Sequence, residues 1–187
     1  MDRWTKKRRI MRRYDLTASI YDMRYEEEQL IKIEAALKNI NIKARSLALD
    51  VGCGTGLLFQ RITEKTGRVI GLDISRKTIV NAKKRAKKFR NVHLVLADAD
   101  HMPFNNDLFD GVYAFTVIQN IPNPEDTLAE MRRITKLGST FVVTGLKKCF
   151  SRESFMSLLK TAGLNVMRLE DACNLKCYVA VCKKFPP

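Results

Sequence analysis

One carboxylate and three glycines lie close together in the first third of the chain. Asp50 is followed by Gly52, Gly54 and Gly56, and the apolar run before them reads as a buried strand. Glycine tolerates positive φ and lets the backbone approach a ligand closely. A carboxylate beside such a turn can accept hydrogen bonds from a bound polar molecule. The spacing therefore predicts a ligand site in which the main chain makes most of the contacts.

Two more acids end the next two predicted strands. Asp73 closes the apolar run that begins at Arg68, and Asp98 follows the run that begins at Val92. A carboxylate at the end of the second strand can accept both ribose hydroxyl hydrogens of a nucleoside, as it does in dinucleotide-binding proteins. Three acids at three successive strand ends favour a nucleoside ligand, although Asp98 and Asp100 could also simply begin a loop.

The segment Leu47–Gly56, LALDVGCGTG, resembles motif I of the class I S-adenosylmethionine (SAM)-dependent methyltransferases. Rossmann dehydrogenases use G-x-G-x-x-G instead, whereas Gly56 directly follows Thr55 here. The resemblance implies SAM as cofactor. Its methionine moiety would lie on the glycine loop near Asp50, its ribose on Asp73, and its adenine between Ile74, Asp98 and the Ala99 amide. The implied cofactor-binding residues are Tyr14, Tyr21, Asp50, Gly52, Cys53, Gly54, Gly56, Asp73, Ile74, Asp98, Ala99 and Phe115.

Later segments narrow the resemblance to the ubiquinone/menaquinone-type group, methyltransferase type 11. Phe109–Pro124 and Met102–Phe104 follow that group's pattern, as does the N-terminal stretch from Tyr14 to Asp22. In that group a tyrosine lid closes over the SAM site, so Tyr14 and Tyr21 are expected there. Both tyrosines could also be plain hydrophobic anchors. The resemblance covers nearly the whole chain.

The chain departs from this group where the methyl acceptor would bind. The group's usual histidine is replaced by Asn120, preceded by Gln119, and neither amide is a base at pH 7. Their amide oxygens could accept hydrogen bonds from an amine or a ring N–H. Aromatic rings could stack a flat substrate. The predicted catalytic residues are Gln119, Asn120, Tyr21 and Phe115. His93 reads as structural, and His101 is a weak candidate.

Strands and helices alternate along the chain. Strands are expected over residues 46–51, 68–73, 92–97, 109–115, 140–145, 164–170 and 175–182, and helices over 26–40, 56–65, 76–88, 124–136 and 152–161. This alternation predicts an α/β fold. The short connection Asp171–Asn174 allows only an antiparallel final pair. The expected architecture is a single doubly wound Rossmann-like domain over residues 14–187. The resemblance implies a seven-stranded, mostly parallel sheet in the order 3-2-1-4-5-7-6, with strand 7 antiparallel.

The net charge of +14 is concentrated in two segments. Residues 1–13, predicted as a basic arm, hold seven basic side chains and one acid, and residues 76–90 hold eight and none, while the remaining residues balance. Such focused charge favours a polyanion partner, with a solvated surface as the alternative. No arm residue belongs to the cofactor motifs, so SAM affinity is expected not to depend on the arm. The predicted RNA-binding residues are Arg3, Lys6, Lys7, Arg8, Arg9, Arg12, Arg13, Lys83, Lys84, Lys87 and Lys88.

These observations predict a SAM-dependent methyltransferase that methylates a base nitrogen in structured rRNA or tRNA, for instance cytidine N4 or a ring nitrogen. The alternatives are an enzyme acting on a quinone precursor or another metabolite, and a SAM-binding accessory subunit. Five cysteines without paired C-x-x-C spacing predict reduced thiols and no metal site. No signal peptide or apolar span is recognisable, which predicts a cytoplasmic protein without membrane contact. The oligomeric state stays open.

Overall fold

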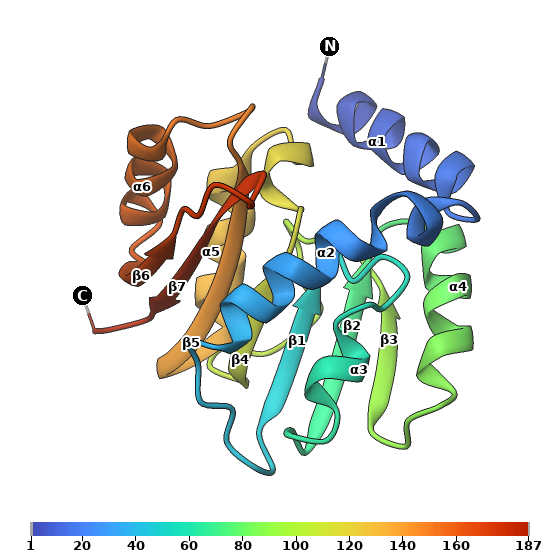
Figure 1. The fold of residues 1–187 in the computed structure, drawn as a ribbon, viewed down its shortest axis with the longest axis horizontal. Coiled ribbons are helices and arrows are strands. Elements are labelled where there is room, and N and C mark those ends of the chain that lie inside the picture. Colours follow the sequence, from blue (N-terminus) through green and yellow to red (C-terminus); the bar gives the residue numbers. More distant parts are fainter. Residues whose placement is uncertain (1, 187) are drawn as a thin grey trace.

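A computed structural model describes residues 2–186 and contains one seven-stranded sheet (Figure 1). The strand order is β3-β2-β1-β4-β5-β7-β6, as predicted. The five neighbouring strands β3, β2, β1, β4 and β5 are parallel to one another, and β7 runs antiparallel to both β5 and β6. The strands are β1 (Leu47–Val51), β2 (Arg68–Asp73), β3 (Val92–Leu96), β4 (Phe109–Ala114), β5 (Thr135–Leu146), β6 (Asn165–Glu170) and β7 (Cys177–Lys183).

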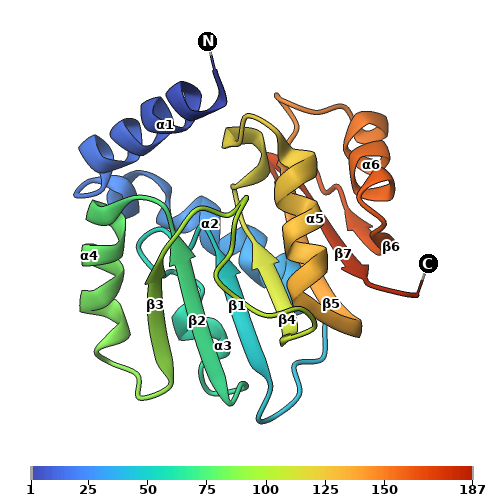
Figure 2. The same ribbon diagram turned by 180° about the vertical axis from the view of Figure 1, so that it is seen from behind.

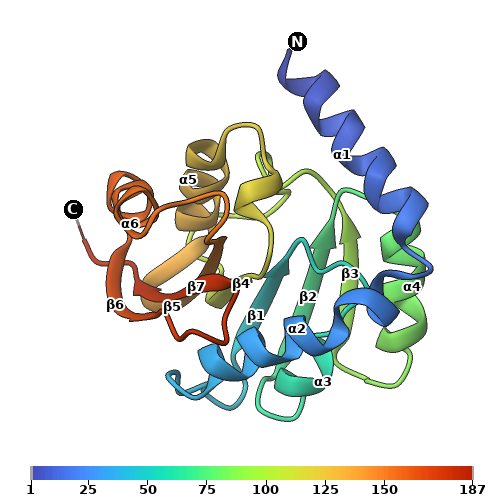
Figure 3. The ribbon, with the colours of Figure 1, turned by 45° about the horizontal axis from the view of Figure 1, so that its top comes forward.

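Helices cover both faces of this sheet. The helices are α1 (Arg3–Thr17), α2 (Tyr21–Leu37), α3 (Phe59–Ile62), α4 (Arg76–Ala86), α5 (Pro124–Ile134) and α6 (Arg152–Thr161), with one 3₁₀ turn, η1 (Ile118–Asn120). Helices α2, α3 and α4 lie on one face, and α5 and α6 lie on the other (Figures 1 and 2). Helix α1 covers neither face, because it lies beyond the carboxyl ends of the parallel strands (Figure 3).

The core consists of one apolar cluster on each face of the sheet. Phe109, Phe141 and Phe155 are fully buried on the α5–α6 side. Phe59 and Ile62 of α3 are fully buried on the other side. Truncating one such phenylalanine to alanine typically costs about 3–5 kcal/mol of stability. These clusters hold the strand ends in place.

Serine side chains cap two of the helices. The Ser75 hydroxyl accepts a hydrogen bond from the Thr78 amide, and the Ser151 hydroxyl accepts one from the Ser154 amide. Each such cap is typically worth about 1 kcal/mol. Gly163 adopts a φ of +71° just after α6, the left-handed conformation that commonly ends a helix.

The predicted basic arm is helical from Arg3 onward, as the first part of α1. Asp2 caps α1 by accepting from the Thr5 amide at 2.9 Å, and neither glycine nor proline interrupts residues 3–17. The expected boundary between residues 13 and 14 therefore falls inside α1. Helix α2 starts at Tyr21, five residues before the predicted start.

Two further predictions of local structure are wrong. Strand β5 begins at Thr135, directly after α5, because Thr135 already pairs with Phe109 and the Gly138 amide donates to the Lys184 carbonyl. Gly138, with a φ of +73°, therefore lies within β5 and does not end α5. Helix α3 has four residues rather than ten, since turns occupy the positions around it.

Candidate cofactor site

A pocket opens at the carboxyl ends of the parallel strands, under α1 and the start of α2. Its empty space, part of it open to solvent, is about 810 Å³. Its lining comes from five predicted regions of the chain. The lining residues are Lys7, Ile10, Tyr14, Tyr21, Gly52, Gly54, Thr55, Leu72, Asp73, Ile74, Thr78, Ala97, Asp98, Ala99, Phe115, Thr116, Val117, Asn120, Ile121 and Pro122.

The glycine loop forms the floor of this pocket. Gly52, Gly54 and Gly56 have φ values of +64°, +55° and +83°, a region that side chains other than glycine rarely adopt. A Cβ on Gly54 would meet no atom closer than 4.0 Å, whereas one on Gly52 would come within 2.6 Å of Val117. Gly56 packs against the Phe59 ring and is not among the residues lining the pocket. The loop thus exposes its main chain mainly at Gly52 and Gly54.

Asp73 ties the second strand to the glycine loop. One of its carboxylate oxygens accepts from the Gly54 amide at 2.9 Å, and the other accepts from the Ser75 amide at 2.8 Å. Burial raises the pKa of Asp73, although these backbone hydrogen bonds oppose the shift. Each carboxylate oxygen has a further lone pair, so this group could also accept from two ligand hydroxyls.

Asp50 lies in a recess next to the main pocket. It is 3% exposed, and the recess includes Tyr21, Gly52, Cys53 and Gly54. Burial, together with the nearby Asp73 carboxylate, raises the pKa of Asp50 well above its usual range. Buried carboxylates require a compensating partner. The recess therefore fits a cationic group of a ligand.

Asp98 and Ala99 border the pocket at the end of the third strand, as expected. One oxygen of Asp98 accepts from the Asp100 amide at 3.0 Å, and the other lies 2.5 Å from the Lys7 ammonium. Lys7 lies equally close to Asp100. Arg3 pairs with Asp100 and Asp126. Lys7 of the predicted arm therefore lines the pocket, although the predicted cofactor-binding residues include none from the arm.

Asn120 connects α1 to the loop that follows β4. Its amide nitrogen donates to the Tyr14 hydroxyl at 2.9 Å and to the Thr116 carbonyl at 2.8 Å, while its oxygen accepts from Arg13 at 2.7 Å. The Asn120 oxygen thus already accepts from Arg13 and keeps one further lone pair, so its contact with a substrate stays a prediction. Burial raises the pKa values of Tyr14 and Tyr21, so neither phenol is a base at neutral pH.

Other predicted residues lie away from the pocket. Gln119 is not among the lining residues, and both atoms of its amide group are buried without a partner among the described residues. Cys53 is buried and lines only the recess. His93 and His101 are exposed. Residues 2–186 contain no cluster of three potential metal ligands and no helix long and apolar enough to cross a membrane.

Two carboxylates that sequence reasoning did not assign hold the N-terminal helices over the site. Asp15 accepts from the Ser75 hydroxyl at 2.6 Å, at the start of α4. Asp22 accepts from the Thr55 hydroxyl at 2.6 Å and from Arg85 at 3.1 Å. Both acids directly follow the tyrosines of the predicted lid, so this position was the available signal.

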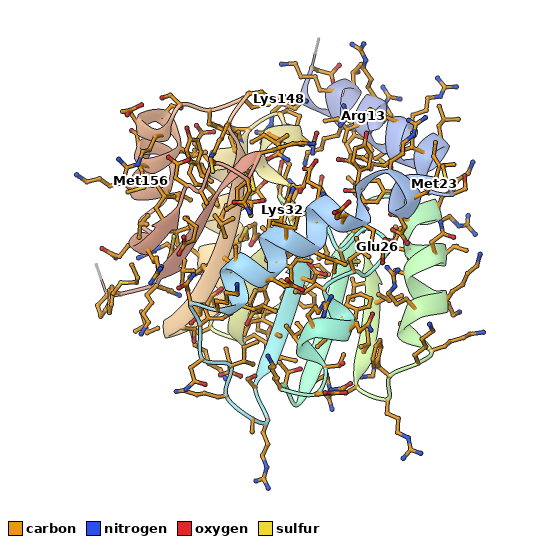
Figure 4. All side chains as sticks on the ribbon, viewed as in Figure 1. Arg13, Met23, Glu26, Lys32, Lys148 and Met156 are labelled. Carbon is orange, nitrogen blue, oxygen red and sulfur yellow. The ribbon has the colours of Figure 1, made fainter. Side chains whose placement is uncertain are left out.

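The other predicted RNA-binding residues of α1 and α4 are exposed. Lys6, Arg8, Arg9 and Arg12 are exposed on α1, and Figure 4 shows α1 side chains extending away from the molecule. Lys83, Lys84, Lys87 and Lys88 are exposed on and just after α4. The end of α1 contacts the start of α4 (Figure 1), so the two basic segments meet at one corner, but Lys83–Lys88 lie toward the far end of α4.

Comparison with known proteins identifies the family of this chain. Residues 49–143, which contain the glycine loop and the three strand-end acids, match the family described as "Methyltransferase domain". The chain belongs to this methyltransferase family. It is a class I SAM-dependent methyltransferase of the ubiquinone/menaquinone-like group, as predicted.

Curated relatives of this methyltransferase act on different molecules. A demethylmenaquinone methyltransferase of Staphylococcus saprophyticus is 36% identical over 109 residues, which are 57% of this chain and 47% of that protein. A malonyl-[acyl-carrier protein] O-methyltransferase of Marinomonas is 30% identical over 146 residues, 76% of this chain and 53% of that protein. The chain thus spans about half the length of the curated relatives it matches.

Solved structures share the fold. A chain from the complex of the Haloferax volcanii Trm112 methyltransferase activator with its candidate methyltransferase has a TM-score of 0.80 and 18% identity, covering 92% of this chain and 98% of that one. A SAM-dependent methyltransferase from Aquifex aeolicus has a TM-score of 0.73 and 19% identity, covering 80% and 88%. At these identities the likeness concerns the fold.

The cofactor of this methyltransferase is SAM, and the pocket fits it. The recess at Asp50 suits the ammonium of the methionine moiety, and Asp73 has spare acceptor capacity for ribose hydroxyls. Asp98, Ala99 and Ile74 border the side where adenine would lie. When bound, SAM supplies an electrophilic methyl group, and the chain's own residues must position the acceptor.

Proposed function

We propose that this methyltransferase methylates a base nitrogen in structured RNA, either rRNA or tRNA. The observation that carries the proposal is the two-sided character of α1. Its inner side contributes Lys7, Ile10 and Tyr14 to the cofactor pocket. Its solvent-facing basic residues, Lys6, Arg8, Arg9 and Arg12, remain exposed. A row of basic groups beside the opening of a methyl-transfer site suits a phosphate backbone.

The exposed charges of α4 extend this surface. Arg76 and Lys77 lie at the corner where α1 meets α4, and both are exposed. Contacts of this kind supply affinity but little sequence information. The RNA backbone near the target nucleotide would contact α1. The target base would then have to leave its stack to enter the pocket, as enzymes that act on bases require.

The part of the pocket around Phe115 and Asn120, where the methyl acceptor would bind, favours a nucleophile that already has a lone pair. Phe115 and the rings of Tyr14 and Tyr21 border the pocket, and aromatic faces stack flat bases. The polar groups in contact with Asn120 are the Tyr14 hydroxyl, the Thr116 carbonyl and the Arg13 guanidinium. The described residues that line the pocket include no histidine. Methyl transfer to a neutral ring nitrogen needs no early proton removal, so positioning supplies most of the catalysis.

Mass spectrometry of RNA nucleosides tests this function. Total RNA from cells with and without the gene would be digested, and methylated nucleosides compared. We expect one methylated base nitrogen to disappear and to return when the purified protein and SAM are added to the RNA. Unchanged nucleosides in both rRNA and tRNA would overturn the proposal.

A second candidate function is methylation of a small molecule such as a quinone precursor. The demethylmenaquinone methyltransferases among the relatives favour it. The same pair of strains would then differ in a lipid or metabolite extract while their RNA nucleosides matched. This outcome separates the two functions.

A partner subunit is a further possibility that the structural comparison raises. One structural neighbour comes from a complex with the activator Trm112. Methylation assays of the purified chain, with and without a co-expressed activator of that kind, would show whether this chain acts alone. Activity only in the complex would indicate that the chain depends on a partner.

A further inference from the structure

Helix α2 contains a buried lysine, Lys32, that does not line the cofactor pocket. Lys32 is 1% exposed and lies near the centre of the molecule (Figure 4). Its ammonium donates to a Glu28 carboxylate oxygen and to the Thr116 hydroxyl, both at 3.1 Å. Burying a cation is costly unless every donor is used. Its contact with Thr116, which lines the pocket, suggests a functional use.

The direction of the hydrogen bonds beyond Lys32 follows from its chemistry. An ammonium group only donates, so the Thr116 oxygen accepts from it. The single hydroxyl hydrogen of Thr116 then goes to the Gln29 carbonyl oxygen, 3.0 Å away. With its oxygen used in this way, the Gln29 amide nitrogen donates to the Tyr21 hydroxyl at 3.3 Å. The opposite orientation of the Gln29 amide would leave the Thr116 hydrogen without an acceptor.

This chain of donors ends at a hydroxyl whose hydrogen faces no protein acceptor. The Tyr21 oxygen accepts from Gln29, and none of residues 2–186 accepts a hydrogen bond from Tyr21. Tyr21 borders both the main pocket and the recess that contains Asp50. Burial raises the pKa of Tyr21, so the hydroxyl keeps its hydrogen at neutral pH.

The recess needs a donor of this kind. Asp50 suits the ammonium of an amino acid, but none of the residues lining the recess is a lysine or arginine that could meet the carboxylate of the same amino acid. The Thr55 hydroxyl already donates to Asp22. The donors that remain are backbone amides of the glycine loop, the Tyr21 hydroxyl and the second amide hydrogen of Gln29, which also lines the recess. Of the two side chains, only Tyr21 also borders the main pocket.

We infer that the Tyr21 hydroxyl donates a hydrogen bond to the carboxylate of the SAM methionine moiety, and that Lys32, Thr116 and Gln29 are positioning residues that orient it. The inference concerns the cofactor and holds for any methyl acceptor. The inference gives the buried Lys32 ammonium a role. Because an ammonium group only donates, it sets the direction of the hydrogen bonds from Lys32 through Thr116 and Gln29 to Tyr21.

Two adenosine thioethers test this inference by calorimetry. S-Adenosylhomocysteine contains the amino-acid moiety, and 5′-methylthioadenosine lacks it. Tyr21→Phe should weaken S-adenosylhomocysteine binding by about tenfold or more, the usual effect of losing a hydrogen bond to a charged group, and leave methylthioadenosine binding unchanged. Lys32→Met should show the same selectivity with a smaller loss. Equal losses for both ligands would mean that these residues only support the fold, and unchanged binding of both would remove Tyr21 from the recess.

Lys176→Met is the matched control. Lys176 contacts the other oxygen of Glu28 at 2.9 Å and is exposed, so its loss should change neither affinity. Lys32→Met combined with Tyr21→Phe should bind S-adenosylhomocysteine no more weakly than Tyr21→Phe alone, because coupled residues are not additive. Additive losses would overturn the positioning role. If Lys32→Met does not fold, Thr116→Val interrupts the same chain without changing the charge or the lining of the recess, and it carries the same expectations.

Discussion

The floor and the cover of the cofactor pocket are held in place by different interactions. The floor consists of residues 50–56, 73–75 and 97–99, and main-chain hydrogen bonds such as Cys53 N–H to the Leu72 carbonyl at 2.9 Å fix it to the sheet. The cover consists of α1 and the start of α2, and side-chain contacts hold it, including Lys7 to Asp98 and Asp15 to Ser75. The floor is thus part of the sheet, whereas the cover could move without breaking the sheet.

Gly54→Ala should have the largest effect on cofactor binding. Gly54 has a φ of +55° and its missing Cβ would point into free space beside the ligand. We expect SAM affinity to fall by roughly 100-fold, about 2.7 kcal/mol, because the added methyl group occupies ligand space. The backbone strain, about 1–3 kcal/mol, is the same with and without SAM and lowers only the stability of the protein. Gly138→Ala is the matched control, because Gly138 has a similar φ of +73° and equally free space outside the pocket. Similar SAM affinities of the two variants, measured by calorimetry, would mean that the Gly54 main chain does not contact the cofactor.

Asp50→Asn should separate binding from stability within the floor. The buried carboxylate has a raised pKa, so the folded protein takes up a proton more readily than the unfolded chain, and this contribution to stability is lost as the pH rises through the raised pKa. At neutral pH the neutral amide should raise the Tm of the cofactor-free protein by about 2–4 °C, which corresponds to about 1 kcal/mol, while SAM binds about tenfold more weakly. The Tm difference should shrink as the pH falls. Thermal scans of both proteins at several pH values check this. A Tm difference that does not change with pH would mean that the buried Asp50 carboxylate does not cause it.

Lys7→Met should have a smaller effect, since Lys7 belongs to the cover. Its ammonium contacts Asp98 and Asp100, so its loss should loosen α1 and speed SAM release. We expect a change of about threefold in the dissociation rate by stopped-flow fluorescence, in the range of partly exposed ion pairs. Lys6→Met, one residue away on the exposed side, should leave the rate unchanged. Faster release in both variants would mean that helix stability, rather than the contact with the floor, matters.

Charge reversal at Lys83, Lys84, Lys87 and Lys88 should have the smallest effect. These residues lie on and after the far part of α4, away from the pocket opening. SAM affinity should stay within about twofold, and tRNA affinity should fall less than after any comparable change on α1. A loss of tRNA affinity equal to that of an α1 variant, in filter-binding assays, would place the RNA path along α4.

The floor could be predicted from the sequence because its determinants are local. The glycine spacing and the acids at Asp50, Asp73 and Asp98 follow directly from strand ends. The strand order came from the family resemblance together with the short connection before β7. The cover could not be predicted in the same way, since the pairing of Lys7 with Asp98 joins residues 91 positions apart. Helix α1 has no buried residue, so no apolar pattern marked it as part of the fold.

The dependence of RNA binding on salt tests the central claim, that the floor holds SAM while the outer side of the cover binds RNA. Lys6, Arg8, Arg9 and Arg12 would be replaced together by glutamine, and tRNA and rRNA binding followed by anisotropy across a range of salt concentrations. Four lost phosphate contacts should make the slope of log K against log salt shallower by about three, with SAM affinity unchanged. An unchanged slope and RNA affinity would contradict the claim, and the basic side of α1 would then be only a solvated surface.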